Sequence, residues 1–180
     1  ELLEVIVNNY EASIFLVNNI NRTIANFNEK IRASILKVLV EKISDRYIVE
    51  NGTRTDTKYS QIWIRIKGYE TDKIFFGIQN FSVNVDPFFG KGLIVGIFVN
   101  HGVELEEYKT LGTKNSPWWY ANERFKNFND FEIDLQNPKL LSKLIMNQDF
   151  YNGFVEQIVT KTIDYLEIHT DDVIPFLKPI

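Results

Sequence analysis

The residues whose types and order could perform chemistry are Asp86, Glu107 and Lys109, which follow the pattern D…E-x-K. Two carboxylates can hold a magnesium ion, and a lysine beside them can help to polarise an attacking water. This chemistry requires the E-x-K segment to lie on a buried strand that aims both side chains at one site. Residues 103–107 have the acidic sequence Val-Glu-Leu-Glu-Glu, which is typical of a loop. A divergent magnesium-dependent nuclease that uses these three residues is therefore an alternative interpretation.

The remaining residues give little support to catalysis. The two histidines, His101 and His169, are isolated and do not have the spacing of metal ligands. The chain has no cysteine and no G-x-S-x-G segment, so the usual nucleophile patterns are missing. Gly90-Lys91-Gly92 lacks the frame of a phosphate-binding loop and is most simply a turn. We therefore expect no enzymatic activity and no cofactor, with magnesium needed only under the nuclease alternative.

An aromatic cluster favours binding rather than catalysis. Trp118 and Trp119 follow Ser116-Pro117 in a segment without regular periodicity, and Arg124 comes shortly after them. The indole rings could stack on nucleic acid bases or on side chains of a protein partner, with Arg124 supplying a cation. The competing interpretation is that these rings fill the junction between a sheet and its helices. Adjacent residues on extended backbone point to opposite sides, so we expect one tryptophan to be buried and the other exposed.

The charge of the chain limits its partners. The formal net charge is −4, whereas nucleic acid binders usually show a basic excess. Between Arg22 and Lys67, however, ten Lys and Arg residues outnumber five Asp and Glu residues. This stripe is typical of a solvated helix surface, although it could contact phosphates weakly. Nucleic acid and a protein partner both stay open as partners, and the pattern does not indicate an oligomeric state.

Three successive β-strands are expected to organise the fold, over Tyr59–Lys67, Lys73–Phe81 and Gly92–Asn100. In the first strand isoleucine occupies every second position of Ile62–Ile66, which places three isoleucines on one face. The third run is apolar on both faces, so we expect a central strand that is covered twice. Glycine-rich connections such as Gly90-Lys91-Gly92 favour tight turns and an antiparallel meander.

Helices are expected before and after these strands. Residues 1–44 carry apolar side chains at steps of three or four, the pattern of one long amphipathic helix. The same heptad-like spacing leaves open a coiled coil with another chain. Asn137-Pro138 is a strong helix start, and Asp149 is expected to cap a second helix that ends near Ile168. Asp130–Leu135 is expected to form a last strand.

Together these elements predict one α+β domain over residues 1–180. Its expected architecture is a mainly antiparallel sheet of about four or five strands, with a long N-terminal helix and two C-terminal helices packed on one face. A hydrophobic content of 44% and a charged content of 24% are ordinary for a globular domain. No apolar run reaches the length of a membrane span, and the lack of cysteine suits a cytoplasmic protein. Because the chain begins at Glu1, we expect a fragment of a longer protein.

The order of these elements resembles a known family. A long amphipathic helix precedes Ile62-Trp63-Ile64, a Phe-Phe-Gly-Ile strand, a Leu-Ile-Val-Gly-Ile strand, and a Trp-Trp-Tyr segment with Glu123-Arg124-Phe125 before the closing helix. This series over residues 10–168 is similar to the region C-terminal to the catalytic core in bacterial PD-(D/E)xK nuclease superfamily proteins. The resemblance implies a non-catalytic accessory or recognition domain, with the metal-binding Asp and E-x-K of that family lying before Glu1. A stand-alone protein-interaction module is the other alternative.

Overall fold

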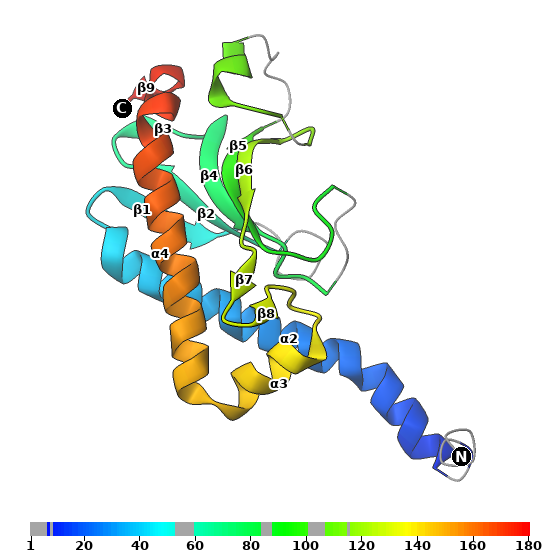
Figure 1. Cartoon of the computed structure of the whole chain (residues 1–180). Coiled ribbons are helices and arrows are strands. Elements are labelled where there is room, and N and C mark those ends of the chain that lie inside the picture. Colours follow the sequence, from blue (N-terminus) through cyan, green and yellow to red (C-terminus); the bar gives the residue numbers. More distant parts are fainter. Residues whose placement is uncertain (1–6, 8, 53–59, 84–87, 101–106, 115) are drawn as a thin grey trace.

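A five-stranded antiparallel sheet forms the centre of the computed structural model (Figure 1). The structure describes residues 7, 9–52, 60–83, 88–100, 107–114 and 116–180. The strands of the sheet are β1 (Tyr47–Asn51), β2 (Gln61–Ile66), β4 (Ile74–Gln79), β5 (Ile94–Val99) and β6 (Trp119–Arg124). Their order is β1-β2-β4-β5-β6, and each neighbouring pair is antiparallel. The expected antiparallel meander is therefore confirmed.

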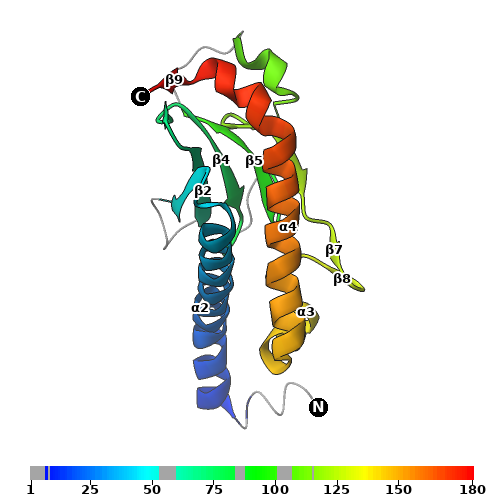
Figure 2. The same ribbon diagram turned by 90° about the vertical axis from the view of Figure 1, so that its left-hand side faces the viewer.

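Two long helices lie on the same face of this sheet (Figure 2). α2 spans Tyr10–Ile43 and α4 spans Gln148–Val173, and the short α3 (Pro138–Met146) leads into α4. The buried side chains on the sheet face that they cover include Ile62, Ile64, Phe76, Ile78, Val95 and Ile97. Burying apolar surface contributes roughly 25 cal/mol per Å² removed from water, so this layer is the main source of stability. The expected α+β architecture is confirmed.

The starts of α3 and α4 have side-chain caps. The Asn137 side chain accepts hydrogen bonds from two backbone N–H groups of the first turn, which confirms the expected start of α3. The expected cap at Asp149 is wrong. The Asn147 side chain accepts from the N–H of Phe150 instead, and Asp149 lies within the first turn of α4. Of the helices that the structure describes, none is long and apolar enough to cross a membrane.

The C-terminal helix is longer than its sequence suggests. The expected end near Ile168 is wrong, because α4 continues to Val173. The Val173 side chain is fully buried, so the last turn of the helix is stabilised by packing. The Thr170 hydroxyl donates to the Leu166 carbonyl oxygen within this last part. η2 (Ile174–Phe176) and β9 (Lys178–Pro179) follow this helix. β9 pairs with the short strand β3 (Tyr69–Glu70).

A β-bulge explains why the edge strand β6 has no sequence signature. Ile97 pairs with Tyr120 and Val95 pairs with Glu123, so β6 has one residue more than β5 over this interval. Ala121 adopts a φ of 44°, in the left-handed region that an alanine rarely occupies. The extra residue breaks the alternation of side chains along the strand. A segment expected to lack regular structure is therefore a strand.

The strand expected over Asp130–Leu135 is mostly wrong. Within this range only Phe131–Glu132 (β8) forms a strand, which pairs with Asn127–Phe128 (β7) in a short hairpin, and Asp134 makes an isolated bridge with Gly92. Asn129 turns the chain between them with a φ of 50°. Asparagine tolerates this conformation better than most residues, which is the physical reason for the tight turn. The hairpin packs against α4, where Phe128 contacts Phe150 and Phe154 edge-on.

Candidate binding face

The face of the sheet that points away from α2 and α4 has a different composition. Pairing places Phe75 beside Phe98, and Phe98 beside Trp119, in one row across three strands. A second row contains Trp63, Gly77 and Gly96. We call this surface the aromatic face, and its rings are Trp63, Phe75, Phe98, Trp118 and Trp119. It has its own small apolar cluster, separate from the core under the helices.

The rings of the aromatic face touch one another in sequence. The ring centroids are 5.0 Å apart for Trp63 and Phe75, 4.8 Å for Phe75 and Phe98, and 5.4 Å for Phe98 and Trp119. The Arg65 guanidinium lies 5.3 Å from the Trp63 ring centroid and 4.6 Å from that of Phe75. These are the separations at which aromatic pairs and cation–π contacts are favourable. The rings form a continuous band from β2 to β6.

Two glycines make room for the Trp119 ring. A Cβ atom added to Gly77 would lie 3.1 Å from Cη2 of Trp119, and one added to Gly96 would lie 3.0 Å from its Cε3. Both distances are tighter than ordinary contacts between carbon atoms. The indole therefore lies across the glycine row, where no other residue type leaves the space. This is why Trp119 is 1% exposed although it belongs to an edge strand.

A pair of glutamines holds the indoles of Trp63 and Trp119. The Trp63 Nε1–H donates to Gln61 Oε1 at 2.7 Å, and the Trp119 Nε1–H donates to Gln79 Oε1 at 2.9 Å. The amides of Gln61 and Gln79 are joined by a hydrogen bond of 2.6 Å from Nε2 to Oε1. Both glutamines are buried, so these bonds satisfy groups that would otherwise be costly to remove from water. The network fixes the orientation of rings on β2 and β6.

The outer rings leave part of their surface accessible. Trp119 and Phe75 are buried, whereas Trp63, Phe98 and Trp118 are only partly buried. Phe88 is 50% exposed, and its ring meets that of Trp118 edge-on with centroids 6.3 Å apart. The face thus has a buried tier that is held by packing and hydrogen bonds, and an outer tier that can accept a planar ligand group.

The structure separates the three residues expected to bind. Trp119 is a core side chain, so it cannot offer a ring to a ligand. Trp118 is partly buried, and its backbone N–H donates to the Ser116 hydroxyl at 3.3 Å. The Arg124 side chain is exposed, and its guanidinium donates to the Phe89 carbonyl oxygen. Trp118 and Arg124 therefore stay candidates, and Trp119 belongs to the buried cluster on which Trp118 packs.

Sequence reasoning missed three partners of these residues, Trp63, Phe98 and Arg65. The signal was present in the alternation of β2, where Trp63 and Arg65 occupy the positions opposite the isoleucines. In β4 and β5 the signal was weaker, because Phe75 and Phe98 have apolar neighbours on both sides. Only the strand register shows that these side chains share a face.

The alternative nuclease site gains no geometric support. Asp86 lies outside the described residues, and nothing is described of the side chains of Glu107 and Lys109. Their backbone belongs to a short 3₁₀-helix, η1 (Glu107–Leu111), and not to a buried strand. Within the described part of the chain, no group of three His, Cys, Asp or Glu side chains could hold a metal ion.

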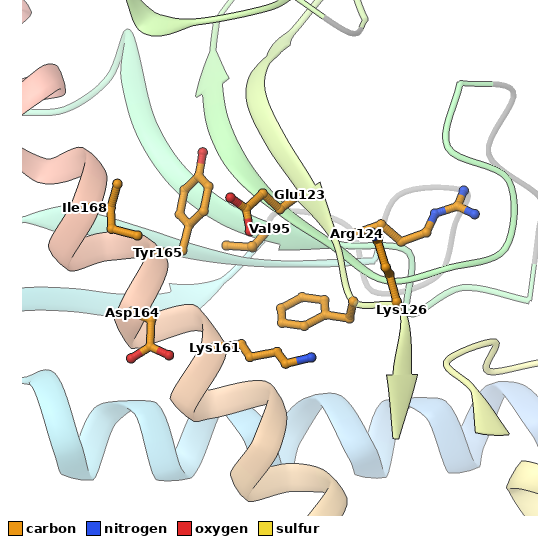
Figure 3. A pocket seen from close by; sticks show the side chains of 9 residues that line it. Val95, Glu123, Arg124, Lys126, Lys161, Asp164, Tyr165 and Ile168 are labelled. Atoms are coloured by element: carbon orange, nitrogen blue, oxygen red, sulfur yellow. The ribbon is translucent and has the colours of Figure 1, made fainter. Parts of the chain in front are cut away.

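A depression lies on the helix side of the edge strand, between β6 and α4 (Figure 3). Its volume is about 260 Å³, and both acidic and basic side chains border it. Tyr165 closes one side, where its hydroxyl donates to the Ala121 carbonyl oxygen at 2.7 Å. Burial raises the pKa of this hydroxyl above its ordinary value of 10.0, and the charges of Glu123 and Asp172 raise it further. The mixed charges do not select one class of ligand.

Comparison with protein-family models, with curated proteins and with solved structures finds no match for this chain. The geometry of the aromatic face is therefore the basis on which a function can be inferred.

Proposed function

We propose that this chain is a non-catalytic recognition domain that binds unpaired nucleic acid bases on the outer tier of its aromatic face. The observation that carries the proposal is the set of partly exposed rings, Trp63, Phe98 and Trp118, next to the exposed Phe88. Each ring is held by a buried neighbour, so little side-chain entropy would be lost when a base stacks on it. Stacking of a base on an aromatic side chain is worth about 1–3 kcal/mol.

Cations near the rings would hold the phosphates. Arg65 lies against two of the rings, and Lys91 and Arg124 are exposed at the end of the sheet that carries Phe89. Arg65 already pairs with the Glu50 carboxylate at 2.7 Å, which reduces its contribution. With a net charge of −4, the domain would bind weakly, in the micromolar range or above, and more weakly as salt increases.

The resemblance to the region beyond the catalytic core of PD-(D/E)xK nuclease superfamily proteins supports the same proposal. In such a setting the domain would hold a single strand for a catalytic core elsewhere and would need no metal itself. We propose that this occurs in the bacterial cytoplasm, a reducing compartment that suits a chain without cysteine.

Fluorescence anisotropy tests this proposal. A labelled single-stranded oligonucleotide of about 12 nucleotides should bind, and a duplex of the same length should bind more weakly, because paired bases cannot stack on the rings. Phe98→Ala and Trp118→Ala should each raise the dissociation constant about five-fold or more, which corresponds to about 1 kcal/mol or more. Chelation of metals should leave the dissociation constant unchanged.

A matched control keeps this test specific. Phe176 is also partly buried, but it packs on Tyr108 near the C-terminus, away from the aromatic face. Phe176→Ala should leave the affinity unchanged. Equal affinities for Phe98→Ala, Trp118→Ala and Phe176→Ala would reject the aromatic face as the binding surface, as would the absence of binding at low salt.

A further inference from the structure

The two edge strands of the central sheet are protected to different degrees. β6 carries the bulge at Ala121, whose N–H donates to the Thr113 carbonyl oxygen, and Lys114 forms an isolated bridge with Tyr120 on the outer side of this strand. β1, at the opposite edge (Figure 1), pairs with β2 without a bulge and contains no proline. Bulges, prolines and covering segments are the usual devices that stop an edge strand from pairing with another chain. β1 is therefore the edge that is open to a further strand.

The ladder between β1 and β2 shows which backbone groups of β1 face outward. The Gly52 N–H donates to a carbonyl oxygen of β2 at 3.0 Å, and the Lys67 N–H donates to the Arg46 carbonyl oxygen at 3.1 Å. The even-numbered positions of this segment therefore bond to β2, and the N–H and C=O groups of Tyr47 and Val49 point away from the sheet. Among the described residues, no backbone group bonds to them on that side. An added antiparallel strand would use these groups.

Three side chains along this edge form a self-complementary series. Arg46, Ile48 and Glu50 occupy alternate positions, so they lie on the same side of the sheet as the aromatic face. Arg46 is exposed, Ile48 is 47% exposed, and the Glu50 side chain is 44% exposed. An apolar residue thus lies midway between a cation and an anion. The same strand in the antiparallel direction presents the anion, the apolar residue and the cation.

We infer that the strand that covers the open edge is β1 of a second copy of this chain, related by a two-fold axis at Ile48. This register places Ile48 opposite Ile48 of the second copy, and it places Arg46 opposite Glu50 of the second copy twice. Tyr47 and Val49 exchange backbone hydrogen bonds with Val49 and Tyr47 of the second copy. Moving the axis to either neighbouring residue would place Ile48 opposite a charged side chain. Apolar and charge complementarity therefore select the same register.

The helix side of this edge also has an exposed apolar residue. Val40 of α2 is 38% exposed, and it precedes Lys42 by two residues, so the two side chains point about 160° apart around the helix. Lys42 forms an ion pair with Glu156 of α4. Because α4 contacts β4 and β5 and α2 contacts β1 and β2, Val40 points away from α4 and towards the β1 edge. The two-fold axis brings this side of α2 towards α2 of the second copy.

Sedimentation velocity of the full chain tests the association. The shared strand is short, so the dimer should be weak and reversible. The average mass should rise from that of the 21.1 kDa monomer towards that of a dimer as the concentration increases through the micromolar range. Ile48→Lys should keep the protein monomeric, because it places two ammonium groups side by side at the axis. Ile145→Lys, at a 62% exposed residue of α3, is the matched control and should leave the association unchanged.

A single cysteine tests the register, because the chain has none of its own. Opposed residues of a non-hydrogen-bonded antiparallel pair have Cα atoms about 4.5 Å apart, which lies within the range that a disulfide spans. Ile48→Cys should therefore form a disulfide-linked dimer under mild oxidation. Glu50→Cys, two residues from the axis on the same edge, should not form one, and neither should Ile145→Cys.

Charge reversal tests the pairing across the axis. Arg46→Glu and Glu50→Arg should each raise the dimer dissociation constant about ten-fold, because each change converts two attractions into two repulsions. An equimolar mixture should recover the association as a heterodimer, since both contacts become attractive again. Circular dichroism confirms that each variant is folded. A parent chain that stays monomeric throughout the micromolar range, a dimer that Ile48→Lys leaves intact, a mixture that stays dissociated, or an Ile48→Cys protein that cross-links no faster than Ile145→Cys would overturn the inference.

Discussion

The two faces of the central sheet are built from different interactions. The face under α2 and α4 is mostly aliphatic, and its side chains are held by burial against the helices. The aromatic face is held by ring contacts, by the glycine row of Gly77 and Gly96, and by the hydrogen-bonded pair Gln61 and Gln79. Apolar burial has no direction, whereas hydrogen bonds and ring packing fix the position of each side chain.

This difference separates stability from recognition. The helix-covered face supplies most of the buried apolar surface and can tolerate exchanges between aliphatic residues of similar volume. The aromatic face holds its outer rings in fixed orientations, which is the property that a stacking surface needs. Two neighbouring residues illustrate the two roles: Trp119 is buried and contributes to stability, whereas Trp118 is partly exposed and can contact a ligand.

The largest expected effect comes from this tryptophan pair. Trp119→Ala should lower the free energy of unfolding by about 3–5 kcal/mol, because it leaves a large cavity over the glycine row. Trp118→Ala should lower it by about 1 kcal/mol or less, because its ring is already partly in solvent. Urea denaturation of both variants measures the difference. Equal and large losses for both would place Trp118 in the core and remove it as a binding contact.

An intermediate effect is expected at Gly96. An added Cβ would lie 2.8 Å from Cβ of Asn122 as well as 3.0 Å from the Trp119 ring. Gly96→Ala should therefore destabilise the fold by about 1–3 kcal/mol through overpacking. Gly153→Ala is the matched control, because its Cβ would meet Phe128 at an ordinary 3.4 Å on α4. Alanine favours a helix over glycine by up to about 1 kcal/mol, so thermal melts should show changes of opposite sign.

A small effect at neutral pH is expected on the helix-covered face, at Tyr165. Tyr165→Phe removes the hydrogen bond to the Ala121 carbonyl oxygen and should cost about 1 kcal/mol. The pKa of Tyr165 is raised in the folded state above its ordinary value of 10.0, so folding favours the neutral phenol. This contribution is complete below pH 10.0 and is lost as the pH rises further, when the unfolded chain ionises first.

Urea midpoints measured on either side of that pH test this assignment. The midpoint of the parent chain should fall as the solution becomes more alkaline, and that of Tyr165→Phe should fall less. The pKa values of Tyr120 and Tyr151 are also raised by burial, so some decrease remains in the variant. Identical pH profiles for the two proteins would show that Tyr165 does not couple ionisation to folding.

Regular patterns predicted the helix-covered face well. Isoleucine at every second position of β2, and the Asn137-Pro138 start of α3, depend on local rules that tertiary packing did not alter. The long helix α2 ends at Ile43, close to the expected end at residue 44. These elements bury one continuous apolar surface, and periodicity reports such surfaces directly.

The aromatic face was only partly predictable because long-range contacts create it. The bulge at Ala121 interrupts the alternation of β6, so the strand could not be recognised from its sequence. The hydrogen bond between Gln61 and Gln79 depends on the register of β2 against β4, which makes these two residues cross-strand partners. The register that aligns Gly77 with Gly96 decides where Trp119 lies, and sequence alone does not specify that register.

Fluorine NMR of the chain labelled with 5-fluorotryptophan tests the division of the aromatic face most directly. The protein has three tryptophans, so it gives three signals, which Trp→Phe variants assign. On addition of the single-stranded oligonucleotide we expect the signals of Trp118 and Trp63 to shift, because they belong to the outer tier. The signal of Trp119 should stay in place, because its ring is buried beneath them. Unchanged Trp118 and Trp63 signals at saturating oligonucleotide, or a shift confined to Trp119, would contradict the assignment of the aromatic face as a base-stacking surface.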